Sequence, residues 1–202
     1  MRYIIMAAGQ GKRWNNYKGV PKHLIEINGE TLLGRTTRLL KENGINDSVI
    51  TISSVKDERY EKYGTTRKQQ LNDCEIDRFD PDNSPEICYL YGDVYYSEEA
   101  IKTIINTPAK DVLFFGSQVE IFAVKIKDKN LFYDHKKHVK ELFLKGKIGR
   151  SIGWEVYRSI NKIPFNTHQI TRRYVVIEDE TDDIDYPEDY ENFIKRRVKW
   201  KR

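Results

Sequence analysis

Glycines and basic residues near the start of the chain form a pattern that can bind phosphate. An apolar run at residues 3–6 leads into Ala7-Ala8-Gly9-Gln10-Gly11-Lys12-Arg13, and Pro21-Lys22 follows after a short interval. The apolar run predicts a buried parallel strand, and glycines at its end let consecutive backbone N–H groups surround an anion. Arg13 and Lys22 add positive charge. Together these features indicate a site for a nucleoside triphosphate.

Two common phosphate-binding motifs do not fit this segment. A dinucleotide-binding fingerprint requires G-x-G-x-x-G, but Trp14 stands at the third glycine position. A Walker loop requires Lys-Ser or Lys-Thr directly after a glycine, whereas Gly11 is followed by Lys12 and Arg13. The pattern therefore belongs to another kind of triphosphate site.

The segment resembles the signature of the nucleotidyltransferases, the superfamily of sugar-nucleotide pyrophosphorylases and cytidylyltransferases, which reads A-A-G-x-G-x-R followed by P-K. The resemblance continues through residues 23–33, then to an apolar strand ending in Gly92-Asp93, and to D-I-D-Y-P-E-D-Y at residues 183–190. That last segment resembles the C-terminal motif of the family, in which an acidic residue precedes T-P-E-D-L, but it has Tyr186 in place of a small residue. These anchors cover essentially the whole chain in order and look most like the small cytidylyltransferases.

The resemblance implies a three-layer α/β/α sandwich with a mostly parallel mixed central sheet, of the Rossmann-like GT-A type. It also implies a magnesium-dependent nucleotidyltransferase, in which a phosphate monoester attacks the α-phosphorus of the triphosphate and pyrophosphate leaves. Because the nucleophile is already an anion at neutral pH, this reaction needs no catalytic base. It needs positive charge where negative charge builds up.

The same resemblance assigns roles to individual residues. Lys22 and Arg13 are the expected catalytic cations, and Asp93 and Asp185 are the expected ligands of Mg²⁺, a hard ion that prefers oxygen. Asp183 remains an alternative to Asp185, and Asp93 could instead cap the helix that begins near Ser97. The expected nucleotide-binding residues are Ala7, Ala8, Gly9, Gln10, Gly11 and Lys12.

The nucleotide and its acceptor are less strongly specified. Ala8 stands where thymidylyl and guanylyl relatives tend to have glycine, which favours CTP, with UTP as the nearer rival in a sugar-1-phosphate uridylyltransferase. We expect the acceptor to be a phosphorylated sugar, polyol or amino alcohol, or a phosphonate. Arginines bind phosphate through paired hydrogen bonds, and aromatic rings can bracket organic groups. The candidate acceptor residues are Glu120, Trp154, Tyr157, Arg158, Arg172 and Arg173, although the helical spacing of Trp154 and Tyr157 also fits core positions.

Two other classes of function remain open. A glycosyltransferase of related fold would consume a nucleotide sugar and would need a D-x-D pair, but this chain has Asp93-Val94-Tyr95. A nucleotide sensor without activity would tolerate the loss of Lys22 or Asp93, and both residues are present. The sequence therefore favours the transferase.

Composition agrees with an enzyme acting on small anions. The 202 residues have 35 basic and 31 acidic side chains, a net charge of +4, which suits anionic substrates but falls short of a nucleic-acid footprint. We expect a single domain over residues 1–202 without a membrane span, located in the cytoplasm and serving cell-envelope or capsule precursor synthesis. A homodimer is left open. Cys74 and Cys88 are expected to be free thiols.

The candidate site residues must be positioned by strands and helices that alternate along the chain. This alternation predicts a mostly parallel sheet covered on both faces. Further strands are expected at 49–53, 112–115, 119–126 and 174–177, and the strand before Asp93 is expected to end at that residue. Helices are expected from Leu32 to a left-handed cap at Asn43-Gly44, over 57–63, after Ser97, over 128–145 and 151–161, and from Pro187. Residues 65–85 are expected to form a long irregular loop, and such loops are often functional.

Overall fold

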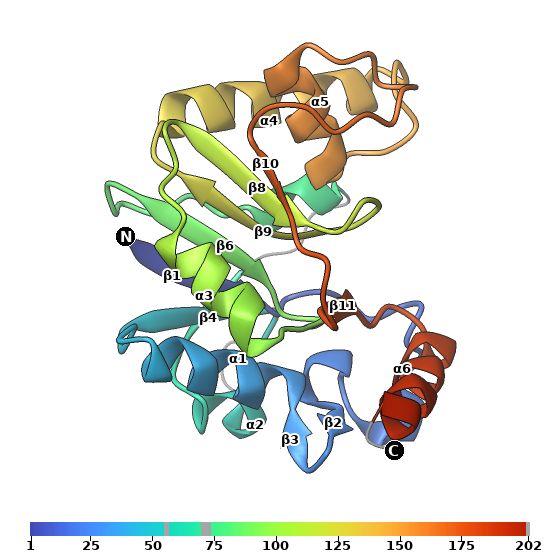
Figure 1. Cartoon of the computed structure of the whole chain (residues 1–202). Helices are drawn as coiled ribbons and strands as arrows, with labels where there is room; N and C mark the ends of the chain where they lie inside the picture. The colour runs from blue at the N-terminus through green and yellow to red at the C-terminus, as the bar shows by residue number, and fades with distance from the viewer. Residues whose placement is uncertain (55–56, 70–73, 201–202) are drawn as a thin grey trace.

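A seven-stranded sheet forms the centre of the molecule in the computed structural model, which describes residues 1–54, 57–69 and 74–200 (Figure 1). Within this sheet, β9 (Ile121–Ile126) runs antiparallel to its neighbours β6 (Ile87–Tyr91) and β8 (Val112–Gly116), and the other neighbouring pairs are parallel. In sheet order the strands are β10 (Tyr174–Val176), β8 (Val112–Gly116), β9 (Ile121–Ile126), β6 (Ile87–Tyr91), β1 (Arg2–Met6), β4 (Ser48–Ile52) and β5 (Thr65–Lys68).

Helices cover both faces of this sheet, as Figure 1 shows. Tyr3 and Ile5 of β1 pack with α1 (Leu32–Glu42) and α3 (Glu98–Asn106), whereas Ile4 and Met6 pack with α4 (Lys129–Leu144) and α5 (Gly153–Asn161). The alternation follows from the two-residue period of a strand, and an apolar run without polar positions is what a strand buried on both faces requires. The α/β/α sandwich expected from the sequence is confirmed.

Several helix boundaries follow from local capping chemistry. Ser97 Oγ accepts a hydrogen bond from the amide of Ala100, so the predicted start of α3 is confirmed. Helix α1 ends at Glu42, and Gly44 has the left-handed φ of 82° expected after a helix end. Helix α6 (Pro187–Trp200) begins at the predicted proline.

The predicted loop over residues 65–85 is wrong in part. Its first residues form β5, paired with β4 at the edge of the sheet, and Glu75–Arg78 form the short 3-10 helix η3. The strand was missed because Thr-Thr-Arg-Lys is polar throughout, which an edge strand tolerates but which lacks apolar alternation. Residues 70–73 of the predicted loop lie outside the described residues. The short helix α2 (Glu58–Glu61), predicted over 57–63, precedes β5.

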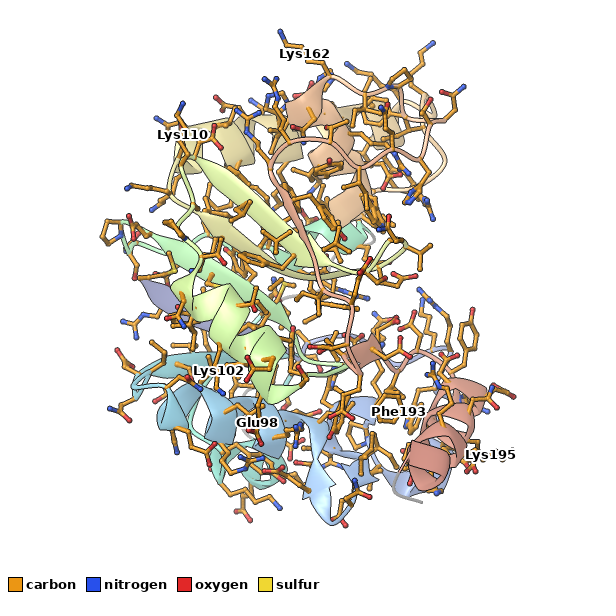
Figure 2. All side chains as sticks on the ribbon, in the orientation of Figure 1. Glu98, Lys102, Lys110, Lys162, Phe193 and Lys195 are labelled. Atoms are coloured by element: carbon orange, nitrogen blue, oxygen red, sulfur yellow. The ribbon has the colours of Figure 1, made fainter. Side chains whose placement is uncertain are left out.

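A small third core lies beside the main sheet. It joins α6, the hairpin of β2 (Glu26–Ile27) and β3 (Glu30–Thr31), and an antiparallel pair of β7 (Val94–Tyr95) with β11 (Asp182–Asp183). In Figure 2, Phe193 points from α6 toward the rest of the protein and Lys195 points away. The Phe193 ring lies 4.8 Å from that of Tyr95. This core attaches the C-terminal segment to the end of the sheet.

Cys74 and Cys88 are buried free thiols, as expected. Within the described part of the chain, no helix combines the length and the apolar character needed to cross a membrane.

Candidate active site

The candidate site lies where the order of strands reverses. From β1 the chain passes to β4 on one side and later to β6 on the other, so the carboxyl ends of β1 and β6 border a crevice between oppositely directed connections. Such points are the usual ligand sites of open α/β sheets. A cavity of about 560 Å³ lies there, bordered by residues that follow both strands.

The glycine-rich segment forms one wall of this cavity. Residues 9–13 line it, and Gly11 has a φ of 59°, a left-handed conformation that glycine adopts without strain. Ala7 and Ala8 are buried behind this wall. A Cβ added at Gly9 would lie 3.7 Å from Arg78 Nη2, so this loop and η3 approach closely. The structure thus places the predicted phosphate-binding segment at the cavity, with only its two alanines set back from the surface.

Lys22 lies on the floor of the cavity. It begins the 3-10 helix η2 (Lys22–Leu24) directly after Pro21, and it is only 8% exposed. Its Nζ donates a hydrogen bond to Asp185 Oδ1 at 2.7 Å and forms an ion pair with Asp93. Burial lowers the pKa of Lys22, but the charges of Asp93 and Asp185 outweigh this effect and raise the pKa above its usual value. Lys22 is therefore a buried ammonium at neutral pH.

Asp93 follows β6 by two residues, because the strand ends at Tyr91 and Gly92 makes the turn. A side chain at Gly92 would lie 2.7 Å from the Met6 carbonyl oxygen, so glycine lets this turn lie against β1. Burial raises the pKa of Asp93, but the charge of Lys22 prevails and lowers the pKa to about 2. The alternative role of Asp93 as a cap of α3 does not apply, since Ser97 caps that helix.

Asp183 and Asp185 reach the same cavity from the far end of the chain. The pairing of β11 with β7 extends to a hydrogen bond from the Ile184 amide to the Asp93 carbonyl, 2.9 Å long. Ile184 is fully buried in the third core, and its two neighbours face the cavity because side chains alternate along an extended chain. Asp185 also accepts a hydrogen bond from Arg13.

The two aspartates differ in their charge environment. Burial, followed by the carboxylates of Glu120, Asp93 and Asp185, raises the pKa of Asp183 to about 8. Asp185, in contrast, is held between Lys22 and Arg13. The residue that shares a cation with Asp93 is therefore Asp185, while Asp183 lies beside this arrangement.

The carboxylates around Lys22 are the expected ligands of the magnesium ion. Among the described residues, no group of three or more His, Cys, Asp or Glu side chains could hold a metal ion by itself. Asp93 and Asp185 nevertheless both form ion pairs with the Lys22 ammonium group, so a single small cation can contact both carboxylates. Mg²⁺ in nucleotide enzymes is usually held by one or two carboxylates together with water and substrate phosphates. The residues present fit an ion of that kind.

The expected acceptor residues separate into two groups. Glu120 and Trp154 line the cavity together with the glycine loop. Trp154 is fixed there, because its indole N–H donates to the Val119 carbonyl at 2.9 Å and its ring stacks on Tyr174 at 5.5 Å. Tyr157 is a fully buried core residue, as its helical spacing allowed.

Arg158, Arg172 and Arg173, which were expected to bind the acceptor, do not line this cavity. Arg158 is 4% exposed and donates to Glu155 at 2.8 Å, within its own helix. Arg173 donates two hydrogen bonds to the Asp111 carboxylate, and Arg172 is exposed at a bend of the chain. The rotation of α5 and the path of the chain before β10 turn these groups away from the cavity.

Two other arginines occupy the cavity wall instead, Arg78 and Arg150. Arg78 lies in the segment that was expected to be a functional loop, which is the signal that could have identified it. Arg150 precedes α5, and its Nε donates to the buried Glu155 at 3.3 Å. No motif marks Arg150 in the sequence. The cavity wall therefore carries these two cations in addition to Arg13 and Lys22.

Comparisons of the sequence find two related proteins or families. Residues 3–75 match the family model described as the MobA-like NTP transferase domain. The choline-phosphate cytidylyltransferase of Streptococcus pneumoniae (strain ATCC BAA-255 / R6) is 38% identical over 68 residues, which cover 32% of this chain and 30% of that protein. The matched segment thus spans less than a third of this curated relative.

Solved structures share the fold over nearly the whole chain. The inositol-1-phosphate CTP transferase from T. maritima has a TM-score of 0.62 at 15% identity and covers 96% of this chain and 95% of its own. The CTP:phosphocholine cytidylyltransferase from Streptococcus pneumoniae has a TM-score of 0.60 at 17% identity, with 96% and 98% covered. The nucleoside-diphosphate-sugar pyrophosphorylase from Vibrio cholerae RC9 has a TM-score of 0.66 at 12% identity, with 96% and 99% covered. The N-terminal segment thus matches an NTP transferase family model, and the chain as a whole shares the fold of these nucleotidyltransferases.

Proposed function

We propose that the protein is a magnesium-dependent nucleotidyltransferase that transfers CMP from CTP to a phosphorylated small molecule and releases pyrophosphate. One observation carries this proposal. Lys22 meets Asp93 and Asp185 at a buried point beside a cavity whose wall is the glycine-rich segment. Phosphate binding, cationic charge and two carboxylates are thereby combined at one place, which is what nucleotidyl transfer requires.

Each group of residues has a separate role in the proposed reaction. Backbone amides of the glycine-rich segment hold the β- and γ-phosphates, and Arg13 and Lys22 neutralise the charge that develops as the acceptor oxygen bonds to the α-phosphorus. The bond from that phosphorus to the bridging oxygen breaks, and pyrophosphate leaves with the electron pair. Asp93 and Asp185 would hold magnesium, which would supply further neutralisation of the phosphates. No residue has to remove a proton, because the attacking phosphate is already ionised.

The preference for CTP rests on the Ala7-Ala8 pair and on two relatives. One relative is named as a choline-phosphate cytidylyltransferase and another as an inositol-1-phosphate CTP transferase. Both names describe phosphorylated alcohols as acceptors, which supports the same broad class here. UTP remains the nearest rival nucleotide, and a cytoplasmic role in cell-envelope or capsule precursor synthesis remains a prediction.

A glycosyltransferase reaction has less support. Tyr95 occupies the last position of the D-x-D pair that such an enzyme would need, and its ring is buried against Phe193. It cannot replace the missing carboxylate.

A pyrophosphate-release screen tests the proposed function. Purified protein with Mg²⁺ is given CTP or UTP together with phosphorylated sugars, polyols and amino alcohols. We expect release with CTP and one acceptor class, and a loss of at least about 100-fold in Lys22→Ala and Asp93→Asn. Lys140→Ala is the control, because Lys140 has a similar pairing with Asp77 outside the cavity. Full activity in Lys22→Ala, or nucleotide-sugar consumption without pyrophosphate release, contradicts the proposal.

A further inference from the structure

Lys22 occupies the position that a cation shared by Asp93 and Asp185 would take. Its Nζ lies 2.7 Å from Asp185 Oδ1 and also contacts Asp93 Oδ2. The side chain of Lys22 is 10% exposed, and that of Asp93 is 12% exposed, so water contributes little to screening between them. An ammonium group and a metal ion cannot both occupy the space between the same two oxygen atoms.

The charges at this point are already balanced. Asp93 and Asp185 carry two negative charges, and Lys22 and Arg13 carry two positive ones in direct contact with them. A divalent cation added to these four groups would leave a net positive charge beside the buried ammonium of Lys22, which is unfavourable. The free protein is therefore expected to bind such an ion weakly.

A triphosphate changes this balance because it brings several negative charges to the adjacent glycine-rich wall. Lys22 has a fixed backbone, since the Leu24 amide donates to the Pro21 carbonyl at 2.9 Å and the Ile25 amide to the Lys22 carbonyl at 3.2 Å. Its long side chain can still turn from the carboxylates toward phosphate oxygens without moving that backbone. Asp93 and Asp185 are then free to accept a metal ion.

We propose that Lys22 closes the metal position in the free protein, so that the divalent cation enters the site only together with the nucleoside triphosphate. The inference rests on the proposed function, whose true substrate would then be the complex of the nucleotide with the metal. Lys22 thereby has a second role besides charge neutralisation: it prevents the cation from binding alone.

Direct binding of Mn²⁺ to the nucleotide-free protein, followed by electron paramagnetic resonance of the unbound ion, tests this inference. We expect weak binding to the native protein and binding at least about tenfold tighter to Lys22→Met, in which a neutral chain of similar length replaces the ammonium. The matched control is Lys140→Met, which removes a lysine whose Nζ lies 2.7 Å from Asp77 outside the cavity. This control should leave Mn²⁺ binding unchanged.

Two further variants make the result specific. Adding Asp185→Asn to Lys22→Met should abolish the gain, which locates the ion at this pair of carboxylates. If Lys22→Met does not fold, as judged by circular dichroism, Lys22→Gln takes its place.

In the native protein, the non-hydrolysable α,β-methylene analogue of CTP should increase the Mn²⁺ retained with the protein on rapid gel filtration.

Equal Mn²⁺ affinity in the native protein and the Lys22 variants would overturn the inference, as would a gain that persists with Asp185→Asn. Neither result depends on turnover. A failed pyrophosphate screen combined with the expected Mn²⁺ data would refute the transfer reaction while leaving the role of Lys22 at the cation site supported. An active native enzyme combined with unchanged Mn²⁺ affinity in the Lys22 variants would support the transfer reaction and refute the role of Lys22 at the cation site.

Discussion

Asp189 accepts two backbone hydrogen bonds through one carboxylate oxygen, from the amide of Asp185 at 3.1 Å and from that of Tyr186 at 2.7 Å. It lies in the first turn of α6, where a carboxylate also interacts favourably with the helix dipole. The residue that caps α6 therefore also fixes the backbone that presents Asp185 to Lys22. Helix capping and the geometry of the site are joined at this point.

Replacing Asp189 should affect the reaction more than the fold. Loss of such a capping interaction costs about 1 kcal/mol of stability, but Asp189→Ala also releases the backbone of Asp185, so we expect turnover to fall about tenfold and the Mg²⁺ concentration for half-maximal rate to rise. Asp189→Asn keeps an amide oxygen that can accept both hydrogen bonds and should restore most of the activity. Magnesium titrations of the steady-state rate measure the effect.

The control for Asp189 is Glu188→Ala, an exposed neighbour in the same helical turn. If both alanine variants show the same magnesium dependence as the native enzyme, Asp189 serves the helix alone.

Arg150 should determine acceptor binding. It lines the cavity and is held by the buried Glu155, whereas Arg172 is exposed and outside the cavity wall. Arg150→Ala should raise the KM for the phosphorylated acceptor about tenfold, since a charge-assisted hydrogen bond is lost, and leave the KM for CTP nearly unchanged. Arg172→Ala should change neither constant. An equal rise of both KM values in Arg150→Ala would place this arginine on the nucleotide instead.

His23 should contribute a loss of stability as pH falls below its ordinary pKa. Burial lowers the pKa of His23 from 6.5 to about 4, so the folded protein keeps this ring neutral, whereas the unfolded chain binds a proton below pH 6.5. The stabilisation is fully present above pH 6.5 and is lost as pH falls toward 4, by up to about 3 kcal/mol. Urea unfolding at pH 7.5, 6.5, 5.5 and 4.5 measures this loss.

Substituting His23 checks the assignment. His23→Gln should lack this loss, so the difference in free energy of unfolding between the native protein and the variant should change between pH 6.5 and 4.5. His138→Gln, at an exposed position, should follow the native protein throughout. An unchanged slope in His23→Gln would show that other groups cause the acid sensitivity.

Gly92→Ala should destabilise the protein by about 2 kcal/mol. The added carbon would lie 2.7 Å from the Met6 carbonyl oxygen, so the turn from β6 must move away from β1 and carry Asp93 with it. Gly149→Ala is the matched control, because an added carbon at Gly149 meets no atom within 4 Å. Chemical denaturation distinguishes them, and equal midpoints for the two variants would contradict this account of the turn.

Local sequence determined much of the fold and half of the site. The apolar run at the start of the chain, the glycines after it and Pro21-Lys22 all act within a few residues of one another, so their types and spacing are sufficient to indicate a strand that ends in a phosphate-binding loop. Asp93 could be placed near that loop because the carboxyl ends of parallel strands meet at one edge of a sheet. The rest of the sheet followed from the alternation of strands and helices, except for the polar edge strand β5.

Tertiary structure decided how the C-terminal segment and the arginines take part. Asp185 reaches Lys22 through the pairing of two strands of two residues each, β7 and β11, which are too short to show any period in the sequence. Arg78 and Arg150 line the cavity while Arg158 turns inward to Glu155, because the rotation of a helix and the path of a loop set the direction of a side chain. Those directions depend on packing between segments far apart in the chain, and a local pattern of residues does not contain them.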